Sequence, residues 1–540
     1  METRRHPCLK SLSRRGYIQG VTLCDKSTDN PFCHYFGGLR YALPPSQRWR
    51  KARKLPSTYT YGTKNHPCPC TGPAGVCPQP SFLSLSKEIG WSEDCFQCNV
   101  WVPAGEPPKE GWPVLFFIHG GFLQFGTPNT FSPVGLLGEG ALNAVIVMPA
   151  YRLGVFGFLY SSELENDASS VDETVGNQGF WDQRLALEWT KDNVSLFGGN
   201  PSQITVAGYS AGAYSAFYQL AYDVNLPEDQ AIVKQACIWS NGPATQPKNP
   251  AAAQVQFNQL LSALNIPAGL PAAEKIARLR AVPGQDLLSA AVSVDINQFR
   301  PTTDSVFIPT TLFQSFDDGS FGRRVAARNI RIMLGECRDE RFLYATWFPP
   351  ANNTLAALRK RLLADYPRPV VDALLKLYYP DGTLPTDCTD WHRDAFGRIY
   401  ADMQVHKMQR GLVHSLALGG AAHLLYRYRI EYRLKCADKS IPPAWGVTHA
   451  TDQYMWFWGN GEVLESREKP LIRKALIDPW IRFVHGEPDI DWGTSSHREM
   501  RTLKPDGSVQ IGQDGFWDEA MRVWKALREV GEPEETVAKL

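Results

Sequence analysis

Short apolar runs alternate with amphipathic and glycine-rich stretches in the first half of the chain. Residues 113–121, "PVLFFIHGG", and 143–152, "NAVIVMPAYR", each hold a continuous apolar run, which is typical of a central strand buried on both faces. Residues 177–199, "NQGFWDQRLALEWTKDNVSLFGG", have apolar positions at loosely helical spacing and end in two glycines, which predicts a helix. A further strand is predicted for 202–209, "SQITVAGY", and a second helix for the small residues and helix formers of 211–223.

This order of elements predicts the fold class. Strands that alternate with helices form a parallel sheet whose crossover helices cover its faces, so we expect an α/β protein. Later, a strand is predicted for 330–334, where it ends at Gly335, and another for 421–433, which alternates apolar and polar residues. No internal repeat, low-complexity tract or long linker interrupts the chain, which favours one large domain over residues 1–540.

Composition and charge narrow the class of partner. The chain has 540 residues, of which 43% are hydrophobic, and 56 Lys and Arg nearly balance 55 Asp and Glu for a formal net charge of +1. This composition is typical of a globular protein. The small net charge produces no overall electrostatic field that would attract nucleic acid, so we expect a small or neutral molecule as the partner. No run of about 18 apolar residues is present, which predicts no membrane span. The sequence leaves the oligomeric state open.

The N-terminus and the cysteines bear on the cellular compartment. "METRRHPCLKSLSRRGYIQG" is basic but lacks the apolar run of a signal peptide, which predicts a cytoplasmic protein. Five of the twelve cysteines lie between positions 68 and 98. A disulfide within this group, a zinc site and buried thiols are the alternatives, and zinc is the least favoured because Cys95 and Cys98 lie three apart at the start of a predicted strand and face opposite sides. We therefore predict no metal.

The stretch "VAGYSAG" at 206–212 contains the main candidate for chemistry. Gly-x-Ser-x-Gly is common by chance, but here Ser210 lies between a predicted strand and a predicted helix. A nucleophile held on such a sharp turn needs glycines at positions 208 and 212, because side chains there would collide with the neighbouring strand or helix. The alternative is a helix-capping serine at a glycine-flanked turn. The helix that starts at Ala211 also offers free N–H groups to an oxyanion.

Acyl transfer by serine needs a base, an acid that holds the base, and N–H donors for the oxyanion. Glu340 and His449 follow Ser210 in the chain order of α/β-hydrolases, with separations of 130 (340 minus 210) and 109 (449 minus 340) residues. Both lie in predicted loops after strands. Asp339 is the rival acid. Other histidines read as structural, His119 because it precedes the glycines and His423 because it lies in a predicted strand.

With these motifs in place, the sequence resembles the type-B carboxylesterases, the family that also holds the cholinesterases and fungal lipases, and it is closest in character to fungal carboxylesterases. The resemblance runs through most of the chain. It implies an α/β-hydrolase fold with gorge-forming insertions and a cofactor-free serine esterase that acts through an acyl-enzyme on a small or neutral ester. The blocks that carry it, in the family's order, are "GLRYALPP" (38–45), "SEDCFQCNVWVP" (92–103), "FFIHGGFLQFG" (116–126), "YRLGVFGFL" (151–159), the block of 176–212, "GECRDE" (335–340), "THATDQYMWFWG" (448–459) and "WIRFVHGEP" (480–488).

The resemblance also implies roles for individual residues. By it, Ser210 is the nucleophile, His449 the general base and Glu340 the acid of a catalytic triad. Aromatic residues near the motif loops are expected either to pack in the core or to wall the substrate gorge. The oxyanion hole implied by the resemblance consists of the N–H groups of Gly121, Phe122 and Ala211, and the residues expected to bind substrate are Phe122, Phe125, Tyr209 and Trp445.

The chain departs from the family pattern at several of these positions. Phe122 stands where a glycine or alanine is usual, so its ring is expected to narrow the acyl site, and Tyr209 replaces a common glutamate. Glu340 is followed by Arg341 in place of glycine. The resemblance implies a disulfide between Cys68 and Cys95, which would indicate secretion and not the cytoplasm.

Three functions fit this pattern. Ester hydrolysis is favoured, and an acyltransferase that uses the same acyl-enzyme is the enzymatic alternative. A catalytically inactive, cholinesterase-like binding module is the third, and it is disfavoured because Ser210, Glu340 and His449 are all present. The sequence does not identify the natural ester.

Overall fold

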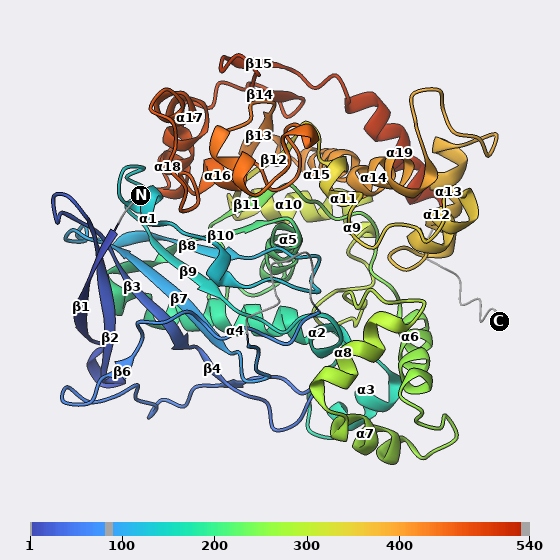
Figure 1. Ribbon diagram of the computed structural model, residues 1–540, viewed down its shortest axis with the longest axis horizontal. Coiled ribbons are helices and arrows are strands. Elements are labelled where there is room, and N and C mark those ends of the chain that lie inside the picture. Colours follow the sequence, from blue (N-terminus) through green and yellow to red (C-terminus); the bar gives the residue numbers. More distant parts are fainter. Residues whose placement is uncertain (1–2, 81–89, 531–540) are drawn as a thin grey trace.

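A single large sheet runs through the protein, and helices cover both of its faces (Figure 1). The computed structural model describes residues 3–80 and 90–530. In this part of the chain the sheet has 13 strands in the order β1-β2-β3-β7-β9-β8-β10-β11-β12-β13-β14-β15, with β6 beside β2. The strands are β1 (Thr3–Ser11), β2 (Tyr17–Asp25), β3 (Pro31–Arg40), β6 (Cys68–Pro69), β7 (Gln97–Pro103), β8 (Trp112–Ile118), β9 (Val145–Pro149), β10 (Gly199–Tyr209), β11 (Gln235–Trp239), β12 (Arg331–Cys337), β13 (Leu425–Ile430), β14 (Glu499–Leu503) and β15 (Val509–Gln513), and β4 (Ala42–Leu43) pairs with β5 (Arg53–Lys54) separately.

The centre of the sheet is parallel and its margins are antiparallel. Strands β9, β8, β10, β11, β12, β13 and β14 pair in parallel, whereas β1 to β3 and the β14–β15 pair are antiparallel. The predicted α/β class is therefore confirmed. The carboxyl ends of the parallel strands share one edge, which is where loops of such sheets carry ligands and reactive groups.

The apolar runs that predicted the central strands are buried on both sides. Every residue of β8 and β9 is buried. Phe116 and Ile118 of β8 belong to one hydrophobic core and Leu115 and Phe117 to the other, because successive side chains of a strand face opposite sides. The sheet thus separates two cores, which we call the first core (with Phe116) and the second core (with Phe117).

Helices complete each core. The first core includes side chains of α4 (Gln178–Asn193) and α5 (Ala211–Asp223), and the second includes those of α16 (Gln453–Trp456) and α18 (Asp478–Val484). The other α-helices are α1 (Val134–Leu137), α2 (Gly154–Phe158), α3 (Ser162–Ser169), α6 (Pro250–Ala263), α7 (Ala272–Ala281), α8 (Gly284–Ser293), α9 (Gln314–Asp317), α10 (Ser320–Ala327), α11 (Arg341–Tyr344), α12 (Leu355–Leu362), α13 (Arg368–Tyr378), α14 (Phe396–Ala401), α15 (Lys407–Leu418), α17 (Glu468–Ile472) and α19 (Trp517–Glu529).

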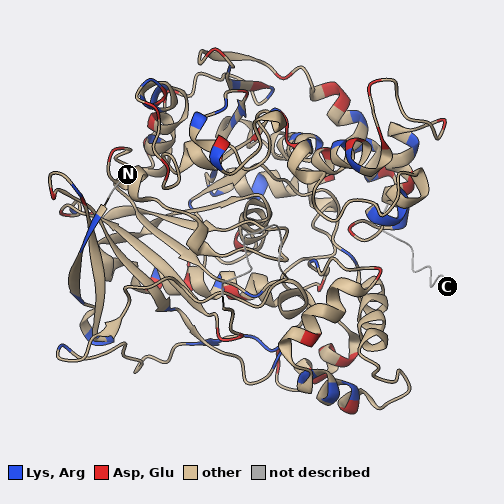
Figure 2. Cartoon of the chain, in the orientation of Figure 1, with Lys and Arg blue, Asp and Glu red and all other residues tan. Residues whose placement is uncertain are grey.

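Charged side chains lie mainly outside the two cores. Figure 2 shows Lys, Arg, Asp and Glu intermixed along the peripheral helices, while the central strands are almost free of them. No helix of the described residues is long and apolar enough to cross a membrane. The chain forms one domain around this sheet, and its extension to residues 1–540 stays a prediction because both ends lie outside the described residues.

Two predicted strand boundaries are wrong. Strand β12 continues through Gly335 to Cys337, because the glycine lets the backbone pack closely against β13: a Cβ at Gly335 would lie 2.3 Å from the carbonyl oxygen of Tyr428. Strand β13 is shorter than predicted, and His423 lies before it in the 3-10 helix η7 (Ala422–Leu424).

The disulfide implied by the family resemblance is also wrong. The structure joins Cys77 to Cys95, whereas Cys68 is a free thiol in β6, opposite Ile18 of β2. Because β6 pairs with β2, Cys68 is held away from Cys95 and does not form the expected disulfide. Disulfides persist in oxidising compartments, so the bond argues against the cytoplasmic prediction and hints at secretion.

Removal of this bond tests the pairing. The Cys77→Ser, Cys95→Ser double variant loses a cross-link between residues 18 positions apart, and a loop of that size stabilises the folded state by about 3 kcal/mol. We expect thermal denaturation at a lower temperature, with no further effect of a reductant. Cys68→Ser is the matched control and should unfold like the parent protein. A Cys68→Ser variant that is as unstable as the double variant would contradict the pairing.

Candidate active site

Ser210 lies at the sharp turn between β10 and α5, with φ 57° and ψ −127°. This left-handed conformation is rare for a residue with a side chain and costs on the order of 1–3 kcal/mol. The flanking glycines make it possible. A Cβ at Gly208 would lie 2.0 Å from the carbonyl oxygen of Gly212, and one at Gly212 would lie 1.9 Å from that of Ile118. The turn therefore needs both glycines, as the sequence predicted.

His449 connects Ser210 to Glu340. Its Nε2 lies 2.8 Å from Ser210 Oγ and its Nδ1 lies 2.5 Å from Glu340 Oε2. All three side chains are buried. When Nδ1–H donates to the carboxylate, Nε2 is left with a lone pair that can accept the serine proton. The structure thus brings together three side chains that are 109 and 130 residues apart in the chain.

Glu340 is fixed by the backbone at the end of β12. Its Oε1 accepts a hydrogen bond from the Cys337 N–H at 2.8 Å, which leaves Oε2 for His449. The carboxylate therefore has a partner on each oxygen although water cannot reach it.

Asp339, the rival acid, has a different position. Its Oδ2 accepts a hydrogen bond from the Val447 N–H at 2.9 Å, and its own N–H donates to the Val447 carbonyl at 2.9 Å. Asp339 thus joins the loop after β12 to the loop that carries His449. The two adjacent acids therefore have different roles. Glu340 contacts the imidazole, and Asp339 holds the loop that carries His449.

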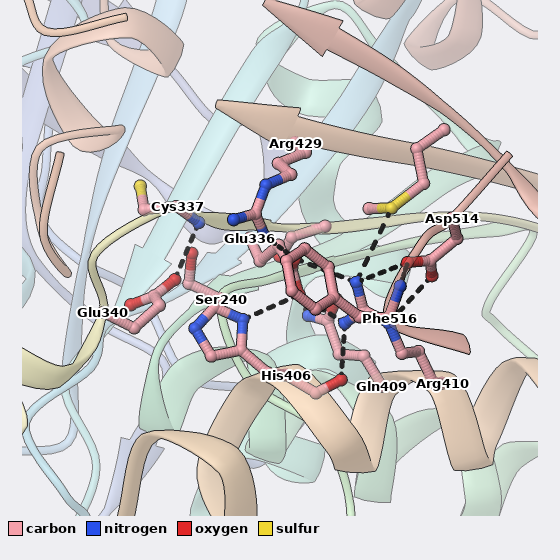
Figure 3. A network of polar contacts seen from close by, with 12 residues as sticks. Ser240, Glu336, Cys337, Glu340, His406, Gln409, Arg410, Arg429, Asp514 and Phe516 are labelled. Atoms are coloured by element: carbon pink, nitrogen blue, oxygen red, sulfur yellow. Dashed lines mark hydrogen bonds and ion pairs between the residues drawn. The ribbon is translucent and has the colours of Figure 1, made fainter. Parts of the chain in front are cut away.

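A buried network of ion pairs and hydrogen bonds lies next to the carboxyl end of β12 (Figure 3). Glu336 accepts hydrogen bonds from Arg410 at 2.7 Å, from His406 at 2.9 Å and from Arg429. Burial opposes ionisation of Glu336, but these cationic groups outweigh it and hold its pKa well below the usual range. Gln409 adds a hydrogen bond to the Gly335 carbonyl at 2.9 Å. The strand that precedes the Glu340 loop is therefore anchored to α15 and its neighbours.

The glycine loop after β8 lies directly against the serine. A Cβ at Gly120 would lie 2.9 Å from Ser210 Cβ, so the chain passes there with no room for a side chain. Gly121 and Phe122 have φ values of 112° and 57°. Within the described residues, no acceptor takes a hydrogen bond from the N–H of Gly121 or Phe122. His119 is structural, as predicted: burial lowers its pKa to about 4, and its ring stacks on Tyr151.

The ring of Phe122 belongs to an aromatic cluster beside the imidazole. It stacks on Trp347 with centroids 4.4 Å apart and on Tyr400 at 6.3 Å, and it meets the edge of Tyr344 at 5.7 Å. Tyr344 in turn lies 4.5 Å from the His449 ring. Sequence reasoning missed these three partners. Tyr344 lies in α11, which begins at Arg341.

The other aromatic residues that were expected to bind substrate lie in different parts of the structure. Phe125 lies near Phe122, with centroids 6.1 Å apart. Tyr209 packs against the His449 ring at 4.9 Å, but its side chain belongs to the second core. Trp445, in the 3-10 helix η9 (Pro443–Trp445), also packs against the second core. Only Phe125 therefore shares the Phe122 cluster.

Asp452 is a further buried acid that sequence reasoning did not identify. Its Oδ2 accepts a hydrogen bond from the Ser240 hydroxyl at 3.0 Å. Burial, and then the charge of Glu340, raise its pKa from 3.8 to about 7. The acid carries a proton at mildly acidic pH and loses it near neutrality, next to the Glu340 carboxylate.

Comparisons with known proteins identify the family and the fold. The model of the carboxylesterase family matches residues 10–522. The chain is 44% identical over 522 residues to a carboxylic ester hydrolase of Gibberella moniliformis, covering 95% of this chain and 94% of that protein. It is 37% identical over 535 residues to an uncharacterized esterase/lipase of Schizosaccharomyces pombe, covering 96% and 97%. The crystal structure of Aspergillus niger EstA, at 20% identity, matches with a TM-score of 0.74 over 98% of this chain and 99% of that one, which shows the α/β-hydrolase fold.

The raised pKa of Asp452 predicts a pH-dependent stability. Because its pKa in the folded protein, about 7, lies above the ordinary value of 3.8, the group contributes stability that is fully present below pH 4 and lost as the pH rises through 7. Asp452→Asn keeps an oxygen for Ser240 and removes the charge. We expect the variant to gain about 1 kcal/mol or more over the parent protein at pH 8 and less at pH 5, as measured by denaturant unfolding. The exposed Asp229→Asn is the control, and an equal gain at both pH values would contradict the prediction.

Proposed function

Since the chain belongs to the carboxylesterase family and is a serine hydrolase of carboxylic esters, we propose that it works through an acyl-enzyme on Ser210. The observation that carries the proposal is the continuous hydrogen-bonded chain from Ser210 through His449 to Glu340. A buried serine in this setting has a base within 2.8 Å to take its proton.

The first half of the reaction forms the acyl-enzyme. His449 Nε2 takes the hydroxyl proton as Ser210 Oγ attacks the carbonyl carbon of the ester. The imidazolium that results is stabilised by Glu340 through Nδ1–H. When the tetrahedral intermediate collapses, the same Nε2 proton passes to the alkoxide of the alcohol, which leaves.

The negative oxygen of the intermediate needs donors that already point at it. We assign this role to the N–H groups of Gly121, Phe122 and Ala211. Two features support the assignment: the glycine loop lies against Ser210, and the first two N–H groups are unused in the described part of the chain. Ala211 adds the first N–H of α5 and the partial positive charge of its N-terminus.

Water completes the cycle. It attacks the acyl carbonyl while His449 accepts one of its protons, and the acid leaves as Ser210 recovers its proton. The names of the relatives are those of hydrolases, so we favour water over an alcohol as the acceptor. We also propose that the enzyme works in an oxidising compartment, on the strength of the Cys77–Cys95 disulfide.

Substitution of the nucleophile tests the proposal. Ser210→Ala should abolish covalent labelling by a fluorophosphonate and should lower hydrolysis of p-nitrophenyl acetate by about 10⁶-fold in kcat. Ser202→Ala is the control, since it removes an exposed hydroxyl of β10 and should leave labelling intact. Labelling that persists in Ser210→Ala would overturn the assignment, and a parent protein that is silent toward the probe would favour a binding module.

Phe122 is proposed to set the size of the acyl group. Its ring is buried among aromatic side chains beside His449, so it fills space that a glycine would leave open. Phe122→Gly should shift the preference from acetate and butyrate toward octanoate and benzoate, with discrimination changed by about 1–3 kcal/mol. The left-handed φ of 57° at this position suits glycine, which protects the fold.

The measurement is kcat/KM for a series of p-nitrophenyl esters. Phe32→Ala, which removes a partly buried ring of β3 that packs against the second core, is the control and should keep the parent profile. If the two profiles for the parent protein and Phe122→Gly have the same shape, Phe122 does not line the acyl site.

A further inference from the structure

A small polar cavity lies beside the aromatic cluster of Phe122. Its volume is about 50 Å³, enough for one or two water-sized groups because a water molecule occupies about 30 Å³. Its lining is half-buried and rich in polar side chains. These are Tyr214, Gln246, Lys248, Gln298, Arg300, Asp365, Tyr366 and Gln404, together with the backbone around Gly242 and Ala244.

Several contacts tie the cavity to Ser210. Tyr214 is one helical turn along α5, and its N–H donates to the Ser210 carbonyl at 3.0 Å. Gly242 follows β11, the strand next to β10, and the Ser210 N–H donates to the last residue of that strand, Trp239, at 2.9 Å. The cavity is therefore at the same edge of the sheet as the nucleophile.

The cavity and the Phe122 cluster share a wall. Tyr400, which stacks on Phe122, accepts a hydrogen bond from Arg300 at 2.9 Å. Trp347, which also stacks on Phe122, donates to Gln298 Oε1 at 2.9 Å. Gln298 and Arg300 are thus hydrogen-bonded to the two rings that stack on Phe122.

The charges of the cavity do not balance. Asp365 accepts from Arg300 at 2.6 Å on Oδ1 and from Arg361 at 2.5 Å on Oδ2, so both of its oxygens are engaged by guanidinium groups. Among the residues that line the cavity, Arg300 and Lys248 are basic and Asp365 is the acid, and Arg361 engages Asp365 from outside the lining.

Lys248 is the cation without an acid. Within the described residues its ammonium group has one hydrogen-bond partner, Gln256 Oε1 at 2.5 Å, and no carboxylate lies within ion-pair distance. Burial and the neighbouring Arg300 lower its pKa to about 7. An ammonium group has three donors, so two remain for a ligand. Lys248 is half-buried, and an ammonium group that is partly shielded from water is stabilised by an anion that accepts those hydrogen bonds.

We propose that this cavity binds a carboxylate at the far end of the acyl group, so that the enzyme prefers esters of dicarboxylic acids. The inference rests on the proposed function, because it assumes that the acyl group is carried by Ser210. Lys248 supplies the charge, and Arg300 and Gln298 flank it. The small volume fits a compact anionic group such as a carboxylate and excludes a longer apolar tail, and the rings of Trp347 and Tyr400 lie between Phe122 and the polar groups of the cavity.

The experiment compares charged and neutral acyl groups of equal length. Mono-p-nitrophenyl esters of malonate, succinate, glutarate and adipate are each paired with the methyl ester of the free carboxylate. In the parent protein, we expect kcat/KM for at least one chain length to be tenfold or more higher for the anion than for its methyl ester. Lys248→Met should remove this preference while kcat/KM for p-nitrophenyl acetate changes less than threefold.

Two controls keep the outcome interpretable. Lys248→Gln is a milder variant in case Lys248→Met does not fold, and Lys376→Met removes an exposed lysine of α13 at the same cost in net charge. The free dicarboxylate should inhibit acetate hydrolysis competitively in the parent protein and in Lys376→Met, and at least tenfold more weakly in the Lys248 variants.

The outcomes distinguish a failure of the carboxylate site from a failure of the proposed esterase function. Hydrolysis of acetate with no preference for any anion, or a preference that survives in both Lys248 variants, overturns the carboxylate site and leaves the esterase assignment standing. A preference for 4-acetoxybenzoate, whose carboxylate is on the alcohol side, also overturns it. Absence of hydrolysis for every ester overturns the proposed function itself.

Discussion

The crowding of backbone around Ser210 is the constraint on which the rest of the site depends. The serine sits in a left-handed conformation at the end of β10, where Gly208 faces the backbone of Gly212 and Gly120 faces Ser210 itself. No other turn would present the hydroxyl at the edge of the sheet with the start of a helix directly behind it. The strain is tolerated because two buried cores fix the strand on one side of the turn and the helix on the other.

The partners of Ser210 then have to be delivered from distant parts of the chain. Glu340 and His449 come from loops after β12 and β13, and parallel strands bring such loops to one edge. Asp339 fastens the two loops to each other through Val447, and the Glu336 network anchors β12 to α15. The acid is therefore positioned by backbone on one side and by buried charge on the other, so the imidazole has a defined orientation without any contact with solvent.

The sequence predicted the parts of the molecule that depend on local pattern. Continuous apolar runs identified the buried central strands, and the glycines around Ser210 identified the turn. It failed where a feature depends on packing between distant segments. Gly335 reads as the end of a strand but allows close contact with Tyr428, and Cys95 pairs with Cys77 because strand pairing holds Cys68 elsewhere. Tyr344, Trp347 and Tyr400 gather around Phe122 without any spacing that could have indicated it.

The net charge describes the whole protein and does not describe any single site. A formal net charge of +1 indicates only that no long-range field attracts ions to the protein. It says nothing about a local cavity such as the one beside Lys248, where ionisable groups lie close together and solvent screens them less than it screens pairs on the open surface. Lys248 and Arg300 lie 52 residues apart (300 minus 248) and converge only when the segments after β11 and before α9 pack together. A neutral overall composition is therefore compatible with a site that selects its substrate by charge.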